Sequence, residues 1–121
     1  MKITLALLLP AFASVLAAES SEAKTVLYTG DALTKICSAA DYYSKGTCAG
    51  YIAGIADAMS GGQPLDGYTA CFSEQVTQGQ LRDIGVRWLT DHPESRDLDA
   101  EAVIARALSA EYPCPRKSSK K

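Results

Sequence analysis

The stretch from Cys48 to Met59 constrains the fold more than any other part of the sequence, because it is apolar, lacks proline and carries a single charge. At about 100° per residue, its bulky side chains fall on one stripe of an α-helix. The members of this stripe are Cys48, Tyr51, Ile52, Ile55 and Met59. We therefore predict a central helix that buries the stripe in the core.

The other side of this predicted helix consists of small residues, including Gly50 and Gly54. Because each glycine costs a helix about 1 kcal/mol, we expect a second element to pack closely on this backbone. Asp57 lies among the small residues near the helix C-terminus, where the macrodipole disfavours a carboxylate. We expect Asp57 to be buried, with an Arg, Tyr or backbone donor as its structural partner. The predicted helix-packing residues are Gly50, Tyr51, Gly54 and Asp57.

Residues 1–18 have the pattern of a secretory signal peptide, with Lys2 before an apolar run and small residues before a cleavage point near Ala17 or Ala18. The apolar run is shorter than the ~20 residues that a membrane-spanning helix needs. We therefore expect a periplasmic or secreted protein without a membrane anchor. Residues 19–115 should form one helical domain, and residues 116–121 a basic, disordered tail.

Four cysteines, an even number in an exported chain, predict two disulfides, for which three connectivities exist. Cys37 and Cys48 lie near the joined ends of two predicted helices, so we expect them to pair and to leave Cys71 for Cys114. The chain-entropy model gives the two bridges about 3 and about 4 kcal/mol. Since the sequence has no C-x-x-C and its only histidine is His92, it indicates no metal site.

Helix start and stop signals place three further helices. We predict one over about 30–40 after a cap at Thr29, one over 78–91 after a capping box formed by Thr77 and Gln80, and one from a cap at Asp99 to about Glu111. Residues 41–47 look like a tight connection, and 60–76 like a long loop. No segment shows convincing alternation of period two. The prediction is a small all-α, four-helix domain stapled by two disulfides.

Composition and motifs argue against several functions. Residues 19–121 contain 11 Lys and Arg against 14 Asp and Glu, and four of the cations lie in residues 116–121, so nucleic-acid binding is not expected. Gly61 and Gly62 lack the lysine and helix of a phosphate loop, and no cofactor is indicated. His92 precedes Pro93 at a predicted helix end, where an imidazole caps terminal carbonyls. We expect no catalytic residues and no enzyme.

The ordered motifs resemble those of the Rap/Tai immunity proteins of type VI secretion. The resemblance is carried by C-x-G-Y-I-x-G-x-x-D-A from Cys48, T-x-x-Q-L from Thr77, W-L-x-x-H-P-E from Trp88 and Y-P-C ending at Cys114. It implies a small helical periplasmic protein that binds and blocks a peptidoglycan amidase effector delivered by neighbouring bacteria. It also implies a homodimer and no enzymatic activity. A small periplasmic helical chaperone of the acid-stress type, without a toxin partner, is the alternative.

An inhibitor of a cleft enzyme must present a segment that protrudes, and two connections qualify, residues 60–68 and residues 92–97. We favour the second, because it is short, contains Pro93 and lies between two capped helices. A glycine-rich loop would lose more entropy on binding. The candidate partner-binding residues are therefore His92, Pro93, Glu94, Ser95 and Arg96.

Overall fold

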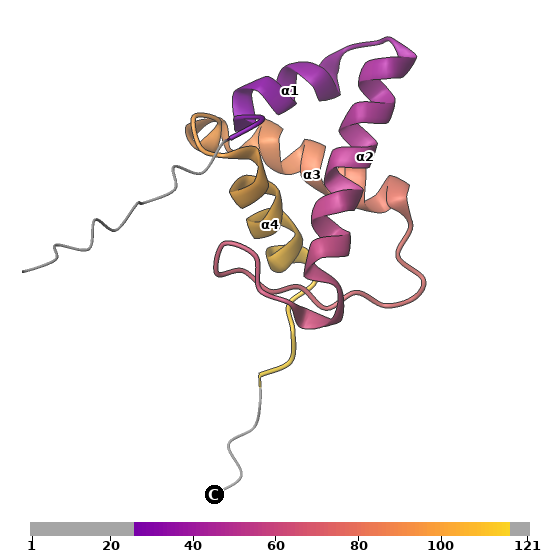
Figure 1. Cartoon of the computed structure of the whole chain (residues 1–121), viewed down its shortest axis with the longest axis vertical. Coiled ribbons are helices and arrows are strands. Elements are labelled where there is room, and N and C mark those ends of the chain that lie inside the picture. The colour runs from indigo at the N-terminus through magenta and orange to yellow at the C-terminus, as the bar shows by residue number, and fades with distance from the viewer. Residues whose placement is uncertain (1–25, 117–121) are drawn as a thin grey trace, which may run out of the picture.

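The computed structural model describes residues 26–116, which form four α-helices and two short 3₁₀ turns (Figure 1). The helices are α1 (Gly30–Ser38), α2 (Tyr42–Met59), α3 (Gln78–Asp91) and α4 (Ala100–Glu111), and the turns are η1 (Ser60–Gly62) and η2 (Pro93–Ser95). Within this part of the chain only isolated bridges occur, and no β-strand. The all-α prediction is confirmed. The predicted signal peptide, and the predicted tail beyond Arg116, lie outside the described residues.

The core forms where α1, α3 and α4 all contact α2. The predicted stripe of α2 does face this core, because Cys48, Ile52 and Met59 are buried while Tyr51 and Ile55 pack against them partly buried. The other helices supply buried aliphatic side chains to the same cluster: Leu33, Ile84, Leu89, Val103, Ile104 and Leu108. The periodicity of α2 therefore identified its buried face.

The start of α2 differs from the prediction, because residues 42–47 are helical instead of forming a connection. Asp41 is the N-cap, and its Oδ1 accepts a hydrogen bond from the backbone N–H of Ser44 at 2.9 Å. The sequence of this turn, with Gly46 and Thr47, has low intrinsic helix propensity. The cap and the packing of the later turns outweigh that propensity, and only residues 39–41 connect α1 to α2.

The helix-packing prediction for Gly50, Gly54 and Asp57 is wrong within this chain, because all three residues are exposed. A Cβ atom built on either glycine would meet no atom within 4 Å. The three neighbouring helices all dock on the bulky stripe, and the small-residue face is left open. Tyr51 does pack as expected, with its ring edge-to-face against Tyr28 at a centroid distance of 5.5 Å.

Asp99 occupies the N-cap position of α4 as predicted, but its side chain makes no capping hydrogen bond. Backbone hydrogen bonds to the segment before α1 satisfy this helix end instead. The N–H of Ala100 donates to the carbonyl of Tyr28 at 2.9 Å, and the N–H of Gly30 donates to the carbonyl of Leu98 at 2.8 Å. Residues 28–30 and 98–100 thus run side by side and join the starts of α1 and α4.

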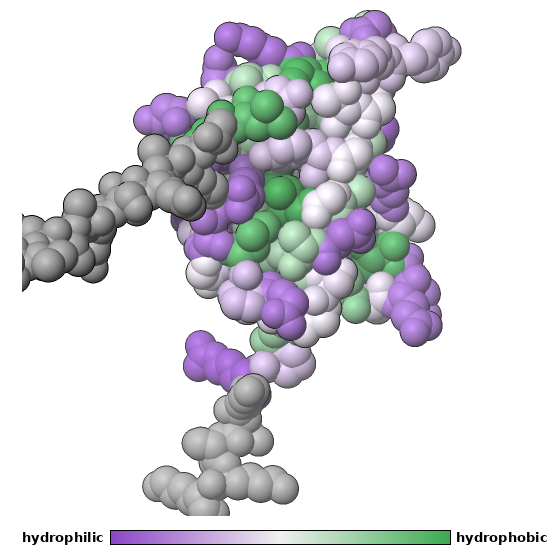
Figure 2. Space-filling view, in the orientation of Figure 1, coloured by the Kyte–Doolittle hydropathy of each residue, from purple (hydrophilic) through white to green (hydrophobic). Residues whose placement is uncertain are grey.

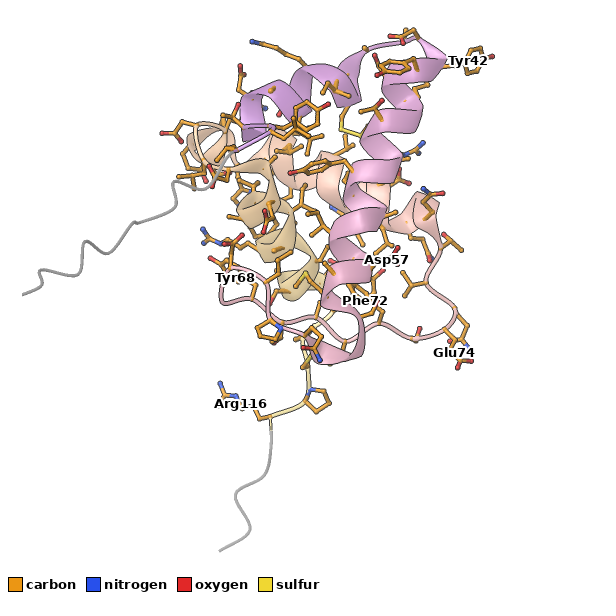
Figure 3. The ribbon with its side chains drawn as sticks, viewed as in Figure 1. Tyr42, Asp57, Tyr68, Phe72, Glu74 and Arg116 are labelled. Carbon is orange, nitrogen blue, oxygen red and sulfur yellow. A yellow bond between two sulfur atoms is a disulfide. The ribbon has the colours of Figure 1, made fainter. Side chains whose placement is uncertain are left out.

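Both predicted disulfides are present and appear as yellow bonds in Figure 3. Cys37–Cys48 ties the end of α1 to α2, and Cys71–Cys114 ties the loop after α2 to the segment after α4. The Cα atoms of the two pairs lie 5.0 and 4.9 Å apart. Among residues 26–116, no helix combines the length and apolar character needed to cross a bilayer.

Candidate protein-binding surface

His92 closes the last turn of α3, as the sequence predicted. Its backbone N–H donates to the carbonyl of Trp88 at 2.9 Å, and its Nδ1 lies 3.0 Å from the same oxygen. Because a carbonyl oxygen only accepts hydrogen bonds, Nδ1 carries the proton. The imidazole also stacks on the Trp88 ring, with 3.9 Å between centroids and 14° between planes. These contacts hold the His92 side chain at the end of α3.

Ser95 and Arg96 are also held by internal contacts. Ser95 is 8% exposed, and its Oγ donates to the carbonyl of His92 at 2.8 Å. Arg96 is half-buried and donates from Nε to the carbonyl of Leu89 at 2.9 Å, so it caps a terminal carbonyl of α3. Of the five predicted contact residues, only Pro93 and Glu94 are exposed.

The connection between α3 and α4 docks on the first turn of α1. The N–H of Asp31 donates to the carbonyl of Arg96 at 2.6 Å. The approach is close at Gly30, where a Cβ atom would lie 2.9 Å from the Cα of Arg96 and 3.2 Å from the carbonyl oxygen of Ser95. The connection is therefore braced from two sides and presents Pro93 and Glu94 on a fixed backbone.

A second exposed feature lies at the other end of α1, in residues 39–45, which we call the α1–α2 corner. Tyr42 is 93% exposed and Tyr43 is 84% exposed, although both belong to the first turn of α2. Figure 3 shows Tyr42 projecting away from the body, and the corner stands out from the surface in Figure 2. The Nζ of Lys45 lies 5.9 Å from the centroid of the Tyr42 ring.

Sequence reasoning assigned these two tyrosines to a connection and gave them no role. A usable signal was present, because neither tyrosine continues the stripe of Cys48, Tyr51 and Ile52 backwards along the helix. Two adjacent aromatic side chains that lie off the buried stripe, next to a helix cap, must face solvent or a partner.

Within the described residues we find no arrangement of side chains typical of a catalytic or metal-binding site. Residues 26–116 contain no group of three or more His, Cys, Asp or Glu that could hold a metal ion. All four cysteines are in disulfides. The pKa of Asp41 is lowered below its usual 3.8, chiefly because the backbone N–H of Ser44 binds the carboxylate, which is the effect of a helix cap.

The sequence model of the Rap1a immunity proteins matches residues 29–114. The chain belongs to the Rap1a immunity protein family. The match begins at the cap of α1 and ends at the second cysteine of the Cys71–Cys114 bridge, so the family covers the whole disulfide-closed body. Membership in this family implies a protein partner, a toxin effector, and the role of a binding protein. A comparison with curated proteins found no match.

Proposed function

We propose that this chain is an exported immunity protein that binds and inhibits a peptidoglycan amidase effector of type VI secretion in the periplasm. The family match over residues 29–114 carries this proposal. Two disulfides support it, because such bridges persist in oxidising compartments, and so does the signal-peptide pattern of residues 1–18.

The connection between α3 and α4 presents Pro93 and Glu94 on a fixed backbone, which favours tight binding by an inhibitor. A segment that is already fixed before binding loses little conformational freedom when it is bound, so more of its contact energy appears as affinity. We propose that Pro93 and Glu94 contact the effector. His92 and Arg96 hold them in place through hydrogen bonds to carbonyls of α3, and Ser95 does so through a hydrogen bond to the carbonyl of His92. We also propose a homodimer, as the family resemblance implies.

The test is a direct binding measurement against the purified product of the reading frame next to the gene of this chain. We expect inhibition of its peptidoglycan hydrolysis and binding by calorimetry. Glu94→Lys should weaken binding about tenfold, equivalent to about 1.4 kcal/mol. Glu74→Lys is the control, because it makes the same charge change at an exposed residue of the loop between α2 and α3 (Figure 3).

Absence of binding by the wild-type chain at micromolar concentration would contradict the proposed function. Equal affinities for Glu94→Lys and Glu74→Lys would instead remove the α3–α4 connection from the interface. Light scattering of the same wild-type sample gives its mass, and a strict monomer would contradict the proposed homodimer.

A further inference from the structure

The α1–α2 corner carries the two most exposed of the large hydrophobic side chains on the described surface, Tyr42 and Tyr43. A buried tyrosine removes 150–250 Å² from water, and neither of these two contributes to the core of this chain. Exposing these two aromatic rings to solvent therefore adds no packing to the stability of the fold. Exposed aromatic side chains of this kind mark interaction surfaces, where tyrosine is enriched.

The backbone beneath these rings is fixed before any partner arrives. The Asp41 cap bonds the N–H of Ser44, and the hydroxyl of Thr47 donates to the carbonyl of Tyr43 at 2.9 Å. The Cys37–Cys48 bridge closes the corner little more than one helical turn below Tyr43. Because only the side-chain torsions of the tyrosines are left free, binding through them costs little conformational entropy.

We infer that the α1–α2 corner is the anchor that holds the toxin effector, with Tyr42 and Tyr43 entering a concave, apolar-lined surface of that protein. This inference rests on the proposed function and adds the location of the contact. The corner is convex, so its complement must be concave, and a cleft enzyme offers such a surface. Each phenol can bury its ring and still place its hydroxyl against a polar group deeper in the cleft.

The environment of Tyr42 favours a protein cleft over a flat ligand such as a sugar ring. A sugar stacks on an open aromatic face, whereas the ammonium of Lys45 lies near the face of the Tyr42 ring.

One partner can reach both this corner and the α3–α4 connection, because they lie at the two ends of α1, which is about 14 Å long. A standard interface covers about 800 Å² on each partner, enough to span that distance. We place the tyrosines at the centre of the contact and Glu94 at its rim. Loss of the rings should therefore weaken binding more than Glu94→Lys does.

The experiment compares Tyr42→Ala/Tyr43→Ala with the wild-type chain, using calorimetry against the purified product of the adjacent reading frame. We expect at least 30-fold weaker binding, with an unchanged circular dichroism spectrum and melting temperature, because neither ring packs in the core. Tyr42→Phe/Tyr43→Phe keeps the rings and should bind within about threefold of wild type.

Three results would overturn the inference. Equal binding by the double alanine variant and the wild type would refute the anchor and leave the proposed function intact. Failure of the wild type to bind would refute both. A double alanine variant that binds normally but changes from dimer to monomer in light scattering would assign the corner to a second copy of this chain instead.

Discussion

At the scale of single residues, the glycines of this chain have opposite environments that the sequence does not distinguish. Gly30 and Gly85 lie where neighbours approach closely, since a Cβ on Gly85 would be 2.7 Å from the Cδ1 of Ile52. Gly50 and Gly54 face open space. Sequence reasoning gave the close-packing role to Gly50 and Gly54, because helix propensity shows that a glycine is unfavourable but not which neighbour requires it.

Gly30→Ala should destabilise the chain by about 1–3 kcal/mol, because the new methyl group would meet the backbone of Arg96, which cannot rotate away. Gly54→Ala is the matched change in open space and should stabilise α2 by up to about 1 kcal/mol. Urea denaturation measures both differences. A Gly30→Ala variant that is at least as stable as the wild type would show that the docking of the α3–α4 connection on α1 is not close.

At the scale of elements, the caps decide how well the helix bounds could be predicted. The bounds of α3 were predicted correctly, because Thr77 and Gln80 form both hydrogen bonds of a capping box. The start of α2 was missed by six residues, because Asp41 was taken as part of a turn.

The long loop between α2 and α3 also holds a tight turn at Asp66 and Gly67. Both residues have positive φ, and a D-G pair is a known signal for such a turn.

The Asp41 cap makes the stability of α2 dependent on pH. Its pKa is lowered in the folded chain, so the charged cap stabilises the fold above the unfolded value and this contribution is lost as pH falls through the folded pKa. Asp41→Asn keeps a capping oxygen that does not titrate in this range. The melting temperature of the wild type minus that of Asp41→Asn should therefore stay constant from pH 7 down to about pH 3.8 and decrease as the pH falls further. Thermal melts from pH 7 to pH 2.5 test this, and a constant difference would contradict it.

At the scale of the whole molecule, the fold class and the disulfide pairing followed from the sequence, whereas the proposed contact surface did not. The spacing of apolar residues along a helix and the positions of the cysteines can be read directly from the sequence, and both reflect the fold. Whether Ser95 and Arg96 face a partner depends on internal hydrogen bonds, to the carbonyls of His92 and Leu89, that only the three-dimensional arrangement reveals. Tyr42 and Tyr43 were overlooked because their helical turn was not predicted.

The two bridges should contribute unequally to global stability. Cys71–Cys114 spans 43 positions and Cys37–Cys48 spans 11, so the chain-entropy model assigns them about 4 and about 3 kcal/mol. Cys71→Ala/Cys114→Ala should lower the free energy of unfolding more than Cys37→Ala/Cys48→Ala does. Chemical denaturation of the two double variants measures the difference, with Cys71→Ala alone as a check on thiol effects.

The separation of Arg116 from Tyr42, at opposite ends of the body in Figure 3, has a practical consequence for surface-based methods. A linker attached after Arg116 leaves the molecule beside the Cys71–Cys114 bridge, away from the α1–α2 corner. Immobilisation through that linker would point the tyrosines outward into the flowing solution. Coupling through the side chain of Lys45 would bury the same residues against the sensor, so comparing the two attachments reports which end of the molecule the effector approaches.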